Sequence, residues 1–131
     1  MGLATAKRFV EEGMDHVFIT RRGKDALDAA ATEIGRNVTG VQGDVANLND
    51  LDRLYEAVKS RYRQIGAIFA NAGVSQIATL GTVDETFFDL HFDANVKGLL
   101  FHGAEGASAN ERRWDDYPER LHRNDQGVPR Y

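Results

Sequence analysis

The stretch VTGVQGDVANLNDLDRLYEAVKSRYRQIGAIFANAG, residues 38–73, decides the fold class of this chain. It contains two short apolar runs, at 38–42 and 67–70, each of the length of a buried strand. Between them, apolar side chains recur every three or four residues and predict an amphipathic helix with Asn47 or Asn49 as its N-cap: Leu48, Leu51, Leu54, Tyr55, Val58 and Tyr62. Two buried strands joined by a helix are typical of a parallel βαβ unit.

The residues on either side extend this alternation. The apolar run at 17–19 predicts a strand from His16 to Thr20, and helices that end at Gly13 and Gly35 flank it. We therefore predict an α/β fold with a doubly wound parallel sheet. From Asp84 another amphipathic helix is predicted, and its pattern ends near Phe101; one face carries Phe88, Phe92, Asn95 and Leu99.

Composition limits the classes of function. The chain has 131 residues, a formal net charge of −4 and no cysteine, so disulfides and thiolate metal sites are excluded. The acidic balance gives no electrostatic reason to bind nucleic acid or an anionic membrane. No apolar run approaches the roughly 20 residues of a membrane span, nothing resembles a signal peptide, and the four histidines lack metal-ligand spacing. We expect a cytoplasmic protein without a metal site.

Three short motifs occur in a characteristic order. Gly43-Asp44-Val45 and Asn71-Ala72-Gly73 each follow a predicted strand, and Asn95-Val96-Lys97-Gly98 lies on a predicted helix. Their order and spacing resemble the middle of a short-chain dehydrogenase/reductase, a family of NAD(P)-dependent oxidoreductases. The resemblance covers residues 2–101 and implies a partial Rossmann-like fold that lacks the first strand. In the sheet order 3-2-1-4-5-6, that strand would lie between the strands at 16–20 and 67–70, so we expect unpaired backbone groups there and marginal stability.

The resemblance also implies cofactor-binding residues near the start of the chain. Gly2 matches the last glycine of the family's pyrophosphate-binding turn. Arg21 and Arg22 follow the strand at 16–20, where an arginine would pair with the 2′-phosphate of NADP. This position favours NADP over NAD, although NAD binding stays open. The alternative is two solvated arginines without a binding role.

The two later motifs complete the implied cofactor site. In the family, the residue matching Asp44 accepts a hydrogen bond from the adenine amino group, and the backbone N–H of Val45 serves a ring nitrogen. The alternative is that Asp44 forms an Asx-turn before the helix at Leu48. Asn71, Ala72 and Gly73 are small residues that would let the backbone approach a ligand, and we expect Gly73 to adopt a conformation that other residues resist.

One catalytic residue is implied. Asn95 matches the helical asparagine that holds a proton-relaying water in the family, whereas Lys97 is not the catalytic lysine. We expect the family's catalytic serine, and its tyrosine four residues before a lysine, to be absent, and we expect Tyr55 and Tyr62 to be core residues.

These implications give two hypotheses about function. The first is a fragment of an NADP-dependent enzyme that transfers hydride between nicotinamide and a small carbonyl or alcohol substrate, inactive as given. The second is a non-catalytic remnant that associates with full-length family members or with itself through the helix containing Asn95.

The last residues differ in composition. Residues 103–131 carry eleven charged side chains but only Leu121 and Val128 from the set Val, Ile, Leu and Phe. Such a segment buries too little apolar surface to offset its ordering entropy, so we expect a partial dinucleotide-binding domain at 1–101 and a disordered tail at 102–131. A one-base frameshift near codon 102 is compatible with a family-like continuation, TVQKAPALMSDGGTIILNASTGMIKGFPA, which resequencing of the gene would test.

Overall fold

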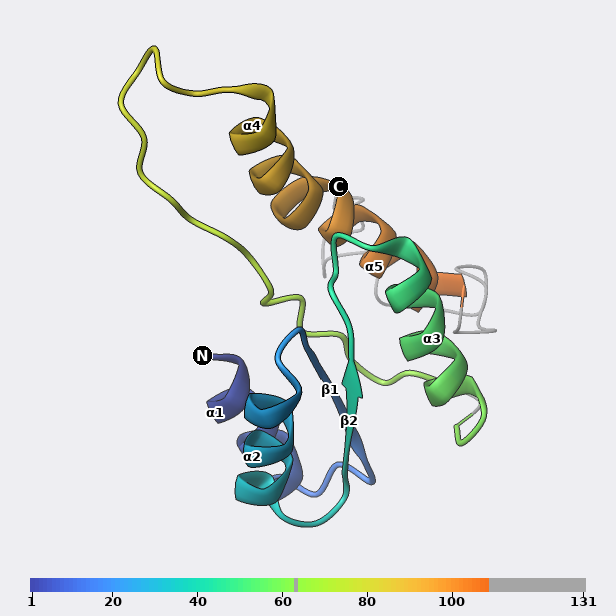
Figure 1. The fold of residues 1–131 in the computed structure, drawn as a ribbon. Helices are drawn as coiled ribbons and strands as arrows, with labels where there is room; N and C mark the ends of the chain where they lie inside the picture. Colours follow the sequence, from blue (N-terminus) through green and yellow to red (C-terminus); the bar gives the residue numbers. More distant parts are fainter. Residues whose placement is uncertain (63, 109–131) are drawn as a thin grey trace, which may run out of the picture.

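The computed structural model of the chain describes residues 1–62 and 64–108. Helices and strands alternate through the first half, and helices follow in the second (Figure 1). In order, the elements are α1 (Gly2–Glu11), β1 (Val17–Arg21), α2 (Lys24–Ile34), β2 (Val38–Gln42), α3 (Leu48–Lys59), α4 (Glu85–Phe92), the π-helical η1 (Asp93–Lys97) and α5 (Gly98–Ser108). The predicted α/β class is confirmed.

The sheet consists of β1 and β2, which run parallel in a register that pairs Val17 with Val38 and Arg21 with Gln42. Local sequence chemistry sets the ends of the helices around it. Gly13 and Gly35 follow α1 and α2 with φ of +89°, a region that favours glycine. Asn47 caps α3 by accepting a hydrogen bond from the Asn49 N–H at 3.1 Å.

The core is small and lies where α2 and α3 meet the sheet. Leu27 of α2 is only 1% exposed and packs against Gly40 of β2, where a Cβ atom would lie 3.0 Å from the Leu27 Cγ. From α3, the residues on the predicted apolar stripe are buried: Leu51, Leu54, Tyr55 and Val58. The helical spacing therefore identified the core face of α3 correctly.

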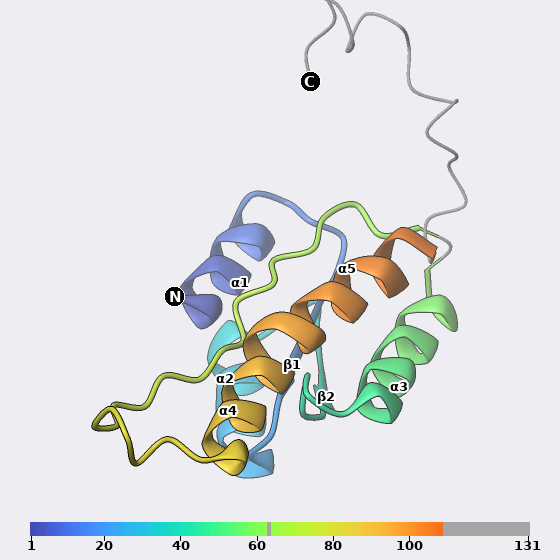
Figure 2. The same ribbon diagram turned by 90° about the horizontal axis from the view of Figure 1, so that it is seen from above.

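Tyr55 joins α3 to α5. Its side chain is 3% exposed, and its hydroxyl donates to the His102 carbonyl oxygen at 2.7 Å and lies 2.8 Å from the His102 Nδ1. Burial, with a smaller effect of Glu105, raises the pKa of Tyr55 to about 12, and burial lowers the pKa of His102. Figure 2 shows α4 and α5 as one continuous helical rod whose α5 end lies beside α3.

Two expectations about secondary structure are wrong. Residues 67–70 do not form a strand, because no described strand lies within hydrogen-bonding reach of them and β1 pairs only with β2. The last helix does not end near Phe101 but continues to Ser108, since its later turns pack against α3 and are held by Tyr55. The disorder predicted for residues 102–108 is therefore wrong as well, because these residues belong to α5. Residues 109–131 lie outside the described part, so the predicted disorder there, the division at residue 101 and the frameshift stay predictions.

Candidate functional site

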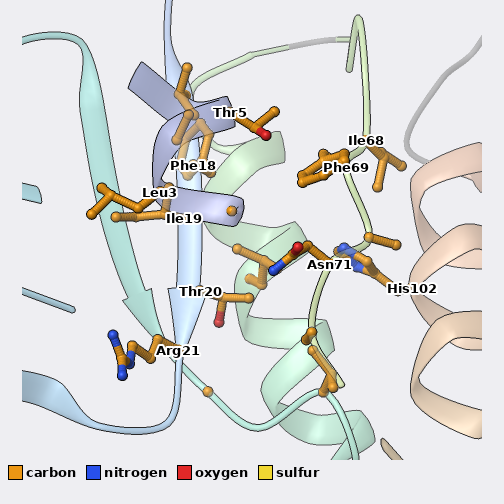
Figure 3. A pocket seen from close by; sticks show the side chains of 18 of the residues that line it. Leu3, Thr5, Phe18, Ile19, Thr20, Arg21, Ile68, Phe69, Asn71 and His102 are labelled. Atoms are coloured by element: carbon orange, nitrogen blue, oxygen red, sulfur yellow. The ribbon is translucent and has the colours of Figure 1, made fainter. Parts of the chain in front are cut away.

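The candidate site lies at the carboxyl ends of β1 and β2, beside a cavity of about 1030 Å³ (Figure 3). The start of α1, the loop after β2 and the loop at 71–74 converge there. The cavity is lined by all eight residues that the resemblance assigned to a cofactor: Gly2, Arg21, Arg22, Asp44, Val45, Asn71, Ala72 and Gly73. Asn95 does not line it. Parallel strands direct their carboxyl ends to one edge, which explains how the residues that follow β1 and β2 meet.

The start of α1 lies against the 71–74 loop. A Cβ atom on Gly2 would lie 3.0 Å from the Asn71 Nδ2, so a larger residue would have to displace that side chain. Asn71 projects from the loop toward α1 in Figure 3. The N-terminal end of a helix favours an anion through its free N–H groups and its dipole, so this corner suits a phosphate group.

The two arginines at the end of β1 have different surroundings. The Arg22 Nη1 lies 3.8 Å from the Asp44 Oδ2, and both side chains are solvent-accessible, so this ion pair contributes at most about 1 kcal/mol. Arg21 forms no ion pair with any residue in the described ranges and is exposed. An anion could therefore bind the Arg21 guanidinium directly, whereas at Arg22 it would compete with the Asp44 carboxylate.

Asp44 forms the Asx-turn that was left open as an alternative. Its Oδ1 accepts a hydrogen bond from the Ala46 N–H at 3.0 Å, and its own N–H donates to the Asp50 Oδ2 at 2.8 Å. That second bond, together with Arg53, lowers the pKa of Asp50. The Asp44 Oδ2 points toward Arg22 and stays accessible. The turn thus leaves one carboxylate oxygen available to a ligand.

Asn95 holds the 71–74 loop. Its Oδ1 accepts from the Val74 N–H at 2.9 Å, and its Nδ2 donates to the Val74 carbonyl oxygen at 2.8 Å. Asn95 lies in η1, and π-helical turns are frequent at functional sites. A Cβ atom on Gly73 would lie 3.0 Å from the Asn95 Oδ1. The expectation that Gly73 needs an unusual conformation is wrong, because its φ is not positive; the close approach of Asn95 is what restricts this position.

Gly98 is the fourth residue of the helical motif, and the sequence alone gave it no role. A Cβ atom at this position would lie 2.7 Å from the Val45 carbonyl oxygen, a distance that real Cβ atoms essentially never show. The glycine therefore lets the start of α5 pack directly on the loop that follows β2. This contact places the Asn95 helix next to Asp44 and Val45.

The expectation that no tyrosine stands four residues before a lysine is also wrong. Tyr55 and Lys59 have this spacing, on α3. The geometry does not fit a general acid/base, however, because the Tyr55 hydroxyl is bound to His102 and its pKa is raised rather than lowered. The expectation that Tyr55 is a core residue is confirmed.

Among the described residues, no group of three or more His, Cys, Asp or Glu side chains could hold a metal ion. Within the same residues, no helix is long and apolar enough to cross a membrane.

Comparisons with known proteins agree on one family of oxidoreductases. A family model described as short chain dehydrogenase matches residues 1–111. "Oxidoreductase asL5" of Sarocladium schorii is 46% identical over 101 residues, covering 77% of this chain and 40% of that protein. The "NADP-dependent 3-hydroxy acid dehydrogenase YdfG" of Salmonella typhi is 31% identical over 103 residues, covering 76% of this chain and 40% of that protein. The chain thus spans about 40% of the length of these relatives.

Solved structures show the same fold. L-Sorbose reductase from Gluconobacter frateurii, complexed with NADPH and L-sorbose, matches with a TM-score of 0.76 and 25% identity over 82% of this chain and 42% of that one. A short-chain dehydrogenase/reductase mutant from Serratia marcescens matches with a TM-score of 0.76 and 23% identity over 83% of this chain and 46% of that one. The second likeness concerns the fold alone.

Proposed function

The chain belongs to the short-chain dehydrogenase family of oxidoreductases, and on that premise we propose that it binds the adenosine half of NADP at the carboxyl edge of its sheet. In this proposal Asp44 and Val45 bind the adenine through hydrogen bonds, and Arg21 binds the 2′-phosphate. The start of α1 at Gly2, with the loop at 71–73, borders the pyrophosphate. Bound NADPH would supply a hydride to a carbonyl substrate, and bound NADP⁺ would accept one from an alcohol.

The observation that carries this proposal is the contrast between the two arginines. Arg22 lies near the Asp44 carboxylate, whereas Arg21 has no anionic partner among the described side chains. A guanidinium without a carboxylate partner matches a phosphate in charge and in hydrogen-bonding geometry. A relative named as NADP-dependent and a structural neighbour complexed with NADPH support the choice of NADP.

We further propose that the 131-residue chain does not transfer hydride unaided. Asn95 would position the loop at 71–74 through Val74 and thereby the nicotinamide side of the site. The tyrosine that has the family spacing, Tyr55, keeps its proton in a bond to His102. A raised pKa disfavours the tyrosinate that the family reaction requires.

Calorimetric titration with two adenosine nucleotides tests the cofactor. We expect 2′,5′-ADP to bind about 10–100-fold more tightly than 5′-AMP, because a hydrogen bond to a charged group contributes about 1.5–3 kcal/mol. Arg21→Gln should remove this preference, and the matched variant Arg22→Gln should retain most of it. Equal affinities for the two nucleotides, or a preference unaffected by Arg21→Gln, would contradict the proposal.

Oxidation of NADPH with a panel of ketones tests the proposed inactivity. We expect no turnover above the rate without protein, and turnover by the isolated chain would contradict this part of the proposal. The nucleotide titration is unaffected by that outcome, so binding and catalysis are tested separately.

A second candidate function rests on an exposed apolar surface. Large apolar side chains of α4, η1 and α5 are between 41% and 65% exposed: Phe88, Phe92, Val96, Leu99, Leu100 and Phe101. Contiguous apolar surface of this kind marks protein interaction sites. It favours a non-catalytic module that associates with itself or with full-length family members. Light scattering of the chain alone and mixed with a full-length relative tests this, with Leu100→Glu as the variant expected to abolish association.

A further inference from the structure

Hydrogen bonds hold three polar groups of Asp44. Within its own turn, the Asp44 Oδ1 accepts from the Ala46 N–H at 3.0 Å, and the Asp44 carbonyl oxygen accepts from the Asn47 N–H at 2.9 Å. The third bond reaches beyond the turn, because the Asp44 N–H donates to the Asp50 Oδ2 at 2.8 Å. The orientation of the remaining carboxylate oxygen, Oδ2, therefore depends partly on Asp50.

Asp50 is itself firmly placed. It is the third residue of α3, and its side chain is only 17% exposed. Its Oδ1 lies 2.8 Å from the Arg53 Nη1, so each carboxylate oxygen has a hydrogen-bonding partner. The bond from the Asp44 N–H, together with Arg53, lowers the pKa of Asp50 and keeps this carboxylate charged at neutral pH. Asp50 thus connects the turn to a helix whose next residue, Leu51, is buried in the core.

The residue before the turn also packs on Asp50. A Cβ atom on Gly43 would lie 3.1 Å from the Asp50 Cβ and 3.4 Å from the Thr20 Oγ1. The Gly43 N–H donates to the Arg21 carbonyl oxygen at 3.1 Å. Residues 43 and 44 are therefore bound to β1 on one side and to Asp50 on the other. A loop held in this way keeps its conformation without a ligand, and such preorganisation increases affinity.

We propose that Asp50 is a positioning residue for adenine, which holds the Asp44 N–H and thereby directs the Asp44 Oδ2 and the Val45 N–H toward the base. The inference rests on the proposed function, in which these two groups bind adenine. An adenine edge presents a donor and an acceptor side by side, so both protein groups must keep a fixed spacing. Asp50 acts through Asp44, since it lines a separate cavity of about 380 Å³ and is not among the described residues that border the larger one.

Calorimetric titration of the full 131-residue chain with 5′-AMP and 5′-IMP tests this role. IMP has a carbonyl oxygen in place of the adenine amino group, and the Asp44 carboxylate would repel it. We expect the wild-type chain to bind AMP about tenfold more tightly, as for the loss of one hydrogen bond to a charged group.

A matched pair of variants at position 50 isolates the bond to the Asp44 N–H. Asp50→Leu keeps a branched side chain but has no acceptor, so the preference for AMP should fall below about threefold. Asp50→Asn keeps an acceptor and should retain a preference of at least about fivefold. Asp52→Leu, the same change at an exposed position of α3, should leave the preference near tenfold. Asp50→Ala should behave as Asp50→Leu does, so the test stands if either variant fails to fold.

The outcomes separate this inference from the proposed function. A preference near tenfold in Asp50→Leu and Asp50→Ala would overturn the role of Asp50 but leave the adenine site intact. Equal losses in Asp50→Asn and Asp50→Leu would also overturn it, because the bond to Asp44 would not be the cause. Weaker binding of both nucleotides at an unchanged ratio would indicate lost stability alone and would contradict positioning. Absence of any preference in the wild-type chain would refute the adenine site itself and, with it, the role of Asp50.

Discussion

Replacing Gly98 with alanine tests how the helical motif is packed on the loop after β2. The added Cβ would lie 2.7 Å from the Val45 carbonyl oxygen and 3.1 Å from that of Asp93, whereas unstrained heavy-atom contacts lie near 3.5–4.0 Å. Both atoms are backbone, so a side-chain rotation cannot relieve the clash. Overpacking of this kind lowers the free energy of unfolding by about 1–3 kcal/mol, and the better helix propensity of alanine offsets about 1 kcal/mol of that loss. We expect a net loss of about 0–2 kcal/mol.

Gly103 supplies the matched control, because it lies in the same helix and nothing approaches its Cβ position within 4 Å. Gly103→Ala should stabilise the chain by about 0.5–1 kcal/mol through helix propensity and reduced unfolded-state entropy. Urea unfolding of both variants, followed by far-UV circular dichroism, should separate them by about 0.5–3 kcal/mol. If Gly98→Ala is as stable as Gly103→Ala, the contact between α5 and Val45 does not restrict this position.

Four further outcomes are expected. Stability should fall as pH rises from 10 to 12, by about 2–3 kcal/mol in total, because folded Tyr55 keeps its proton to a pKa of about 12; Tyr55→Phe should abolish this loss in urea titrations. Stability should also fall as pH drops below about 6.5, because burial lowers the pKa of His102 in the folded chain and the unfolded chain therefore binds a proton at this imidazole more readily. His102→Gln should reduce this loss of stability. Leu27→Ala should lower thermal stability by about 2–5 kcal/mol, a large share of the 5–15 kcal/mol typical of a domain. Asn95→Ala should speed amide exchange at Val74 at least tenfold while leaving unfolding by urea nearly unchanged.

Features governed by nearby residues could be predicted from the sequence. The spacing of Leu51, Leu54 and Val58 identified the buried face of α3, and Asn47 was one of two predicted caps. The family resemblance also assigned Asp44 and Asn71 to one cofactor site, and both line the cavity. These features depend on helical periodicity and on the order of elements along the chain, and both can be identified from the spacing of residues in the sequence.

Features that depend on distant contacts could not be predicted in this way. Residues 67–70 have the composition of a strand, but a strand exists only when a neighbouring backbone pairs with it. The helix continues past Phe101 because His102 meets Tyr55, and Gly73 is restricted by the amide of Asn95 rather than by its own dihedral angles. The ion pair that distinguishes Arg22 from Arg21 likewise depends on the position of Asp44.

The hydrogen bond between Tyr55 and His102 has a consequence for the order of folding. It joins residues 47 apart in sequence, and closing a loop of that length costs about 3 kcal/mol of chain entropy before the contact forms. The local βαβ contacts close much shorter loops and should form earlier. During synthesis α5 would therefore dock last, so nascent chains would expose its apolar residues for the longest time and would be the species most in need of a chaperone.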